Sequence, residues 1–302
     1  MVFSTRRQTG VLSAHTGAVH ALTYSSGAAT YCLSGGADRK IHLYNPSTST
    51  LIQTYTAHGH EVLGISCSPD NALFASCGGD KLVFLWDVST ATTLRRYEGH
   101  WGRINAVDFN FDGSILVSGS YDASIKCWDI KSNSRKPIQS LEDAKDAISD
   151  VKCYGHEIIS ASVDGRVRSY DVRMGRCTVD VVSPSPVTSV AVSRDGAAMV
   201  TAALDGTVRL IDRANGGLLM AYKGHKNTEL RVRAGFAEQE QYVVCGSEDG
   251  EIWVWDLMDG KSCERLSCHR GKVVSSVAYC PAQGRKQMVT GGADGTVVVW
   301  GE

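Results

Sequence analysis

The sequence lacks a long apolar run and an excess of charge of either sign. No stretch approaches the ~20 apolar residues that a bilayer-spanning helix needs. The first 13 residues contain no apolar run of the length that a secretion signal needs. Its 31 basic residues are balanced by 32 acidic ones. Because attraction to phosphate requires a basic excess, we expect no general binding to nucleic acid or to an anionic membrane.

Paired cysteines are also missing, since the ten cysteines include no Cys-x-x-Cys motif. Without a secretion signal, we expect these thiols to be reduced and the protein to lie in the cytoplasm and nucleus. The one tight cluster of cysteine and histidine, Cys263, Cys268 and His269, has no obvious fourth metal ligand. We therefore expect neither a metal nor a cofactor.

Helical periodicity of useful length is absent as well. No P-loop, dinucleotide fingerprint or nucleophile elbow occurs with the strand-to-helix context that each requires. What the sequence has instead is period-2 runs rich in Val, Ile and aromatic residues, joined by turns such as Ser68-Pro69-Asp70-Asn71. These features predict an all-β protein without a catalytic site.

One segment recurs seven times along the chain. It starts with small or polar residues, continues with a turn Asp, and ends in an alternating run that closes on an aromatic or apolar residue. The Asp residues are 42, 42, 42, 41, 44 and 45 positions apart: Asp38, Asp80, Asp122, Asp164, Asp205, Asp249 and Asp294. A period of about 40–45 residues with four strands is typical of WD repeats. We predict one domain over residues 1–302, a seven-bladed β-propeller with no residues left for a lid or insertion.

A His precedes five of these Asp residues by 22 to 25 positions. Three repeats hold a complete set of His, Ser/Thr, Asp and Trp: His58, Ser76, Asp80 and Trp86; His100, Ser118, Asp122 and Trp128; and His269, Thr290, Asp294 and Trp300. In WD-repeat blades such a set forms a buried hydrogen-bond chain, in which each lost bond costs roughly 1–3 kcal/mol. A catalytic triad occurs once and needs an oxyanion site, so we interpret these sets as structural.

Four repeats depart from the complete set. The repeats around Asp164 and Asp205 lack both His and Trp, so we expect those two blades to be held less firmly and their rims to be more mobile. The His15 set ends in Tyr44, and the His225 set carries Cys245 in place of a hydroxyl. The final repeat lacks an outer strand, which the run Gln8–Ser13 is expected to supply, removing an exposed edge.

Loops on a rigid scaffold are where binding residues concentrate. In WD propellers, partners often contact the residue before the turn Asp and those three and five positions after the His. Here these positions include Tyr121, Glu248, His20, Glu61, Leu63, Arg103, Asn105 and Lys272. Trp101 follows His100 directly, so we expect Trp101, Arg103 and Tyr121 to form one aromatic and basic cluster of the kind that dominates binding hot spots. The alternative is that Trp101 covers a neighbouring loop.

A second candidate surface is rich in arginine. Arg166, Arg168 and Arg173 fall within a few residues of one another, followed by Arg176. The segment is either a solvated outer strand and turn or a surface for an acidic partner, because the planar guanidinium group suits carboxylate and phosphate.

The same segment carries a more specific resemblance. The run Ser162–Arg168, with Tyr170-Asp171 and Arg173-Met174-Gly175, resembles the mitogen-activated protein kinase organizer family of WD-repeat scaffolds. Gly59–Leu63, Gly78–Lys81 and Tyr222–Asn227 match in the same order. The resemblance implies a non-catalytic scaffold for kinases of the extracellular-signal-regulated cascade, or a spliceosome-associated subunit in pre-mRNA splicing. A substrate receptor of a ubiquitin ligase stays open for any WD propeller. We expect protein partners and a monomer on its own.

Overall fold

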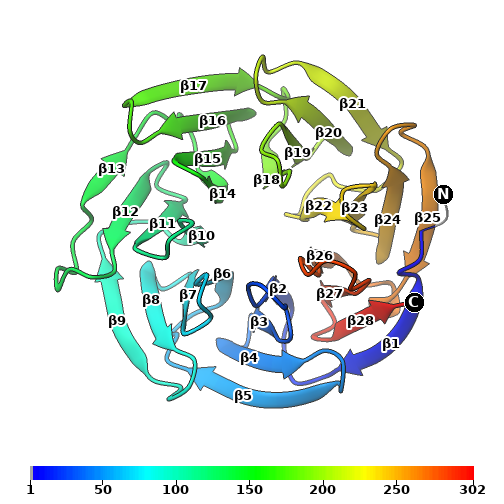
Figure 1. Ribbon diagram of the computed structural model, residues 1–302, viewed down its shortest axis with the longest axis horizontal. Helices are drawn as coiled ribbons and strands as arrows, with labels where there is room; N and C mark the ends of the chain where they lie inside the picture. Colours follow the sequence, from blue (N-terminus) through cyan, green and yellow to red (C-terminus); the bar gives the residue numbers. More distant parts are fainter. Residues whose placement is uncertain (1–2) are drawn as a thin grey trace.

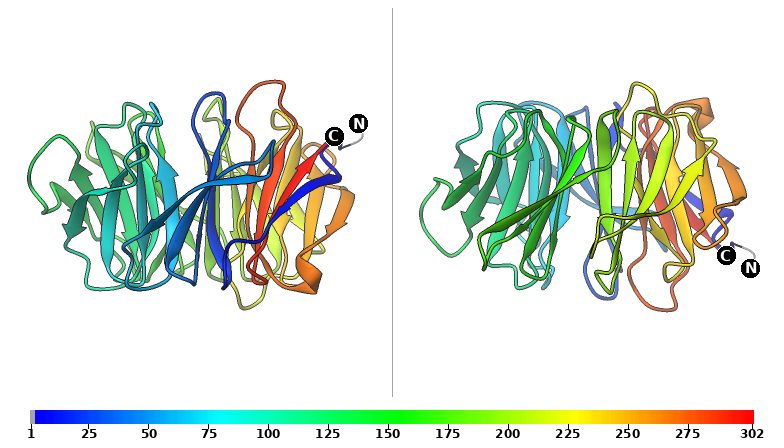
Figure 2. Two further views of the ribbon diagram at one scale, coloured as in Figure 1. Left: turned by 90° about the horizontal axis from the view of Figure 1, so that it is seen from below. Right: turned by 90° about the horizontal axis from the view of Figure 1, so that it is seen from above.

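The computed structural model describes residues 3–302 as a ring of seven four-stranded antiparallel sheets, the blades, around a central axis (Figure 1). Seen from the side, the ring is a disc with loops on two opposite faces (Figure 2). The predicted seven-bladed β-propeller is confirmed. The only helical segment in the described residues is one 3-10 turn, η1 (His269–Gly271), so no helix there is long enough to cross a membrane.

The strands fall into four concentric positions. Innermost, in blades one to seven, are β2 (Val19–Tyr24), β6 (Val62–Cys67), β10 (Ile104–Phe109), β14 (Ile148–Tyr154), β18 (Val187–Val192), β22 (Ala234–Ala237) and β26 (Val274–Tyr279). Second are β3 (Cys32–Gly36), β7 (Leu73–Gly78), β11 (Ile115–Ser120), β15 (Glu157–Ser162), β19 (Ala198–Ala203), β23 (Tyr242–Gly246) and β27 (Met288–Gly292). Third are β4 (Lys40–Asn45), β8 (Leu82–Asp87), β12 (Ile125–Asp129), β16 (Arg166–Asp171), β20 (Thr207–Asp212), β24 (Glu251–Asp256) and β28 (Val297–Gly301). Outermost are β5 (Thr50–Thr56), β9 (Thr93–Glu98), β13 (Gln139–Leu141), β17 (Arg176–Val181), β21 (Leu218–Lys223), β25 (Ser262–Ser267) and β1 (Arg7–Leu12).

The hydrophobic core consists of seven clusters, each lying between two adjacent blades. Between blades one and two, for example, Ile41 and Leu43 of β4 share a cluster with Val62 and Ile65 of β6. A blade buries apolar side chains on both of its faces, which is why the second strands are almost continuously apolar or small rather than alternating. Each blade is therefore stabilised by both neighbours.

The ring closes within blade seven, where the first strand of the chain pairs with the last. Strand β1 runs antiparallel to β28, with Arg7 opposite Gly301 and Leu12 opposite Val297. The predicted closing strand is thus confirmed, one residue earlier than the expected Gln8–Ser13. Pairing leaves β28 without a free edge, which an open propeller would expose.

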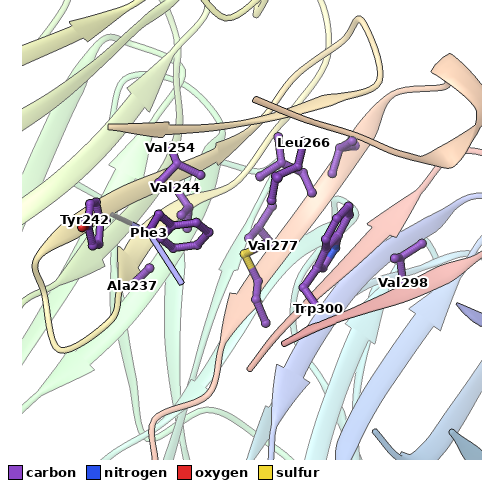
Figure 3. Close-up of a cluster of buried hydrophobic side chains, with 12 residues drawn as sticks. Phe3, Ala237, Tyr242, Val244, Val254, Leu266, Val277, Val298 and Trp300 are labelled. Carbon is purple, nitrogen blue, oxygen red and sulfur yellow. The ribbon is translucent and has the colours of Figure 1, made fainter. Parts of the chain in front are cut away.

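Residues before β1 reach past blade seven to blade six (Figure 3). Phe3 is fully buried, and its ring meets that of Tyr242 edge to face at 5.3 Å. The backbone N–H and hydroxyl groups of Ser4 and Thr5 all donate to Glu238 Oε1, over 2.7 to 3.0 Å. The N-terminal segment therefore joins blades six and seven as well as completing a sheet.

Candidate functional site

All five His marks and the seven turn Asp residues lie on one face of the disc, which we call the histidine face. It comprises the loops before the innermost strands and the turns between second and third strands. The hairpins between first and second strands, and between third and outermost strands, make up the opposite face.

Each complete set forms a continuous hydrogen-bond chain. Trp Nε1 donates to the Ser/Thr hydroxyl, that hydroxyl bonds His Nε2, and His Nδ1 bonds the Asp carboxylate. In that order the distances are 2.8, 2.7 and 2.6 Å for Trp86, Ser76, His58 and Asp80; 2.9, 2.9 and 2.9 Å for Trp128, Ser118, His100 and Asp122; and 3.0, 3.0 and 3.1 Å for Trp300, Thr290, His269 and Asp294. The three hydroxyls are 0% exposed, so no substrate reaches them.

The hydrogen bonds of a complete set keep its Asp side chain ionised, as Asp122 shows. Burial works to raise the pKa of the Asp122 carboxyl, but hydrogen bonds from His100 and Ser124 outweigh it and hold the pKa well below its usual range. The carboxylate thus stays charged and also accepts the backbone N–H of Trp101 at 3.1 Å.

In blades four and five an arginine takes the place of the missing imidazole. Arg168 donates to both carboxylate oxygens of Asp164, at 2.6 and 3.2 Å, and is 1% exposed. Arg209 pairs with Asp205 in the same way. Both arginines stand four residues after the turn Asp, a position occupied in blade two by Phe84. The recurring motif Asp-Gly-x-Val-Arg was the sequence signal that could have predicted this Arg–Asp pair. The greater mobility expected of the rims of blades four and five stays a prediction.

This arrangement corrects the interpretation of the arginine-rich segment as one surface. Arg168 lies in the third strand β16, buried against its own blade, so it contacts neither solvent nor a partner. Arg166 is half-buried, and Arg173 is exposed in the β16–β17 turn on the opposite face. The predicted Arg166, Arg168 and Arg173 surface is therefore wrong as a contiguous patch.

The two partial sets differ in how much of the hydrogen-bond chain they keep, since blade one lacks one bond and blade six lacks them all. His15 bonds Ser34 at 2.7 Å and Asp38 at 2.9 Å, but the buried Tyr44 hydroxyl has no partner in the described residues. In blade six, Trp255 Nε1 donates to the Lys223 carbonyl at 3.2 Å instead of to residue 245. Within residues 3–302, both ring nitrogens of His225 lack a hydrogen-bond partner, and burial lowers the pKa of His225 to about 4.

One group in the described residues brings three metal-ligating side chains within 4.8 Å: His15, Asp38 and His42. Both nitrogens of His15 are already bonded, and His42 Nδ1 bonds the Thr54 hydroxyl at 3.0 Å. Only His42 Nε2 lacks a partner there. The group therefore presents no open ligand set for a metal.

The predicted aromatic and basic cluster lies on the histidine face of blade three. The Arg103 guanidinium carbon lies 5.1 Å from the centre of the Tyr121 ring, a cation–π distance. Trp101 and Tyr121 are 73% and 57% exposed. At that exposure Trp101 covers little of the neighbouring loops, so the alternative interpretation is not supported.

A cavity of about 280 Å³, the axial cavity, is lined by residues at the start of the innermost strands of blades one, two, three, six and seven. Five of the predicted partner-contact residues line it, among them His20, Glu61, Leu63 and Arg103. Asn105 lines it too, but is 9% exposed and its amide donates to the Ile148 carbonyl at 2.7 Å, so it mainly joins blades three and four.

Two arginines are among the lining residues that the sequence did not predict, Arg231 and Arg233. They flank Val232, which occupies the position of Val62 in blade two, but Val232 is seven residues after its His and Val62 only four. Counting from the His therefore fails in blade six. The apolar residue that begins the innermost strand was the better reference.

Two predicted contact residues have other roles because of such loop insertions. Glu248 Oε1 accepts the backbone N–H groups of Thr228, Glu229 and Leu230 at 2.7 to 2.9 Å, which anchors the inserted loop. Burial opposes ionisation of Glu248, but these bonds outweigh it and lower its pKa to about 2. One extra residue in η1 leaves Lys272 exposed outside the cavity, whose lining instead includes Val273 and Ser275.

Comparisons with known proteins agree with the observed architecture. The family described as "WD domain, G-beta repeat" matches residues 6–45, 49–87, 91–129, 176–212, 216–256 and 260–301. Relatives named WD repeat domain-containing protein 83 include a rat protein, 54% identical over 92% of this chain and 87% of its own length. The human protein is 52% identical over 88% of this chain and 84% of its own length. A Dictyostelium discoideum homolog is 32% identical over 96% of both chains.

Proposed function

Because this chain belongs to the WD-repeat family, we propose that it is a non-catalytic scaffold that binds other proteins through the histidine face. The observation that supports this most directly is the exposure of Trp101 and Tyr121 on the histidine face of blade three, where Tyr121 stacks with Arg103, a residue that lines the axial cavity. Tryptophan, tyrosine and arginine are the residue types most enriched in interface hot spots.

Rigidity adds to the case for this cluster. The Trp101 backbone is bonded to Asp122 of a complete hydrogen-bond set, and the Tyr121 N–H donates to the Arg103 carbonyl at 2.8 Å. Side chains on a backbone that is already ordered lose less conformational entropy on binding. Binding a partner through this cluster should therefore cost less conformational entropy than binding through a mobile loop.

The buried sets support the non-catalytic part of the proposal. Their hydroxyls are fully buried, so no substrate reaches them, and each also accepts a bond from a Trp ring N–H. The same set recurs in three blades, as a structural device does.

For the partners, we propose kinases of a mitogen-activated protein kinase cascade, met in the cytoplasm and nucleus. The support is the resemblance carried by Gly78–Lys81 and Tyr222–Asn227, two segments that reach the histidine face. Affinity capture from the native organism followed by mass spectrometry tests this identity. Recovery of spliceosomal proteins or of ubiquitin-ligase subunits in place of kinases would replace it with the splicing or substrate-receptor role.

The docking face is tested with alanine variants and the strongest captured partner. Trp101→Ala and Tyr121→Ala should each weaken binding by about 2 kcal/mol, or roughly 30-fold, in calorimetry. Arg173→Ala on the opposite face is the control and should bind like the parent. If the two aromatic variants bind normally while Arg173→Ala does not, the face assignment fails.

A further inference from the structure

Three arginines line the axial cavity: Arg103, Arg231 and Arg233. Arg231 is fixed in place: Nη1 donates to the Asn105 carbonyl at 2.8 Å and Nε to the Thr188 carbonyl at 3.2 Å. Arg233 reaches across the axis, where Nη2 donates to the Leu63 carbonyl at 3.4 Å. The positive charges are therefore held at the cavity by bonds from blades two, three and five.

These charges are only partly balanced by the protein. Asp150 Oδ1 lies 3.2 Å from Arg231 Nη2, and Glu61 lies 3.6 Å from His20 Nε2. In residues 3–302, neither Arg103 nor Arg233 has a carboxylate within 4.0 Å. Burial and repulsion from Arg233 and Arg103 together lower the pKa of Arg231 to about 10, so it is still charged at neutral pH.

One hydrogen-bond donor in the cavity has no partner at all. Arg233 Nε is buried and unpaired in the described part of the chain, whereas Arg231 Nη2 makes no hydrogen bond of good geometry but lies 3.2 Å from Asp150 Oδ1. Buried donors on charged groups are costly to leave unpaired, and a carboxylate accepts two parallel N–H bonds from one guanidinium group. The positive charge of the cavity and its unpaired N–H group therefore both favour binding of an anion with planar acceptor oxygens.

We propose that the axial cavity binds the carboxylate side chain of an acidic residue in a protein partner, while an adjacent apolar residue of that partner packs on the rim. The cavity lining includes an exposed apolar residue, Leu230, at 49%. A volume of about 280 Å³ admits one side chain but lies below the range of roughly 300–1,000 Å³ typical of whole small-molecule ligands. This inference rests on the proposed docking face and adds the chemistry of its anchor.

The test begins with selection of random peptides on the immobilised full chain from a display library. Selected peptides should share an Asp or Glu next to an aliphatic or aromatic residue. In fluorescence anisotropy, changing that Glu to Gln in a selected peptide should weaken binding to the parent protein at least about tenfold, since bonds to charged groups are lost. This arm needs no protein variant to fold.

Protein variants then locate the anchor. Arg233→Met and Arg103→Met should each weaken binding of the acidic peptide at least about tenfold but leave binding of the Gln peptide nearly unchanged. Binding of the acidic peptide to the parent protein should also weaken as the salt concentration rises. Lys81→Met is the matched control, because Lys81 is an exposed cation on the same face, outside the cavity. Thermal melting checks that the variants are folded.

Three results would overturn the proposal. Peptides that bind through Trp101 and Tyr121 without an acidic residue would refute the anchor but leave the docking face intact. Equal loss with Lys81→Met would show a diffuse charge effect. Tighter binding of inorganic tripolyphosphate than of the peptides, lost in Arg233→Met, would make the cavity a site for a free anion. Peptides selected on the opposite face would instead contradict the proposed docking face itself.

Discussion

Arg168 is a charged residue that has become part of the core. Its guanidinium group bonds the turn Asp as an imidazole does in the complete blades, and it keeps that Asp ionised. Burial would raise the pKa of Asp164, but the bond from Arg168 outweighs burial and lowers it. Removing one partner of such a buried pair leaves a charge in a poor environment for it.

Arg168→Met should therefore destabilise the protein by about 3–5 kcal/mol, measured by denaturant unfolding. The double variant Asp164→Ser with Arg168→Met should cost less than the sum of the two single changes, because each single change leaves one charge unpaired and the double change leaves none. Arg209→Met is the control and should cost less, since its pair is more exposed, at 16% and 22%. Additive costs in the double variant would show that the two side chains are not coupled.

The same residue shows what sequence reasoning could and could not reach. The His, Ser/Thr, Asp and Trp positions follow from spacing, because the repeat keeps the strand lengths constant between them. Arg168 was misplaced because a charge within a strand is usually solvated, and only the pairing with Asp164 reveals the exception. Arg231 and Arg233 were missed because a loop of variable length lies between them and their His.

At the scale of elements, the N-terminal segment closes the ring in two ways. Strand β1 supplies the outer edge of blade seven, as the repeat pattern predicts. The contacts of Phe3, Ser4 and Thr5 with blade six were beyond such a prediction, because these residues precede the first repeat. They place a buried aromatic ring in the cluster that blades six and seven share.

Phe3→Ala should lower the free energy of unfolding by about 3–5 kcal/mol, because it removes a fully buried ring from that cluster. Phe111→Ala is the matched control: its ring is 62% exposed, and the free energy of unfolding should change by no more than about 0.5 kcal/mol.

Deleting residues 1–13 should lower the melting temperature further than Phe3→Ala does, since β28 then gains a free edge. An unchanged midpoint after the deletion would mean that closure depends on other contacts.

For the whole molecule, the buried histidines set the response to acid. Burial lowers the pKa of His15, His42, His225 and His269, to about 4 for His42 and His225. Unfolded histidine titrates near 6.5, so the unfolded chain takes up more protons as pH falls from about 6.5 toward 4. The contribution of these neutral histidines to the free energy of unfolding is therefore fully present above pH 6.5. It is lost as pH falls from about 6.5 toward 4, before most carboxylates titrate.

The parent protein should thus melt at a clearly lower temperature at pH 5 than at pH 7. His225→Phe should reduce the loss of unfolding free energy between these two pH values by about 2 kcal/mol, because one titrating group is removed. Denaturant unfolding at both pH values measures the difference. An identical loss in parent and variant would show that His225 is not buried in its neutral form.

The pairing of β1 with β28 also fixes the order of events during synthesis. Arg7 leaves the ribosome first, but its partner Gly301 is nearly three hundred residues later in the chain. Until then β1 has no native neighbour, and such distant pairing is slow and leaves strands open to wrong partners. A circular permutant with residues 3–13 moved behind Glu302 would let blade seven form from contiguous chain. It should reach the same ring with faster refolding.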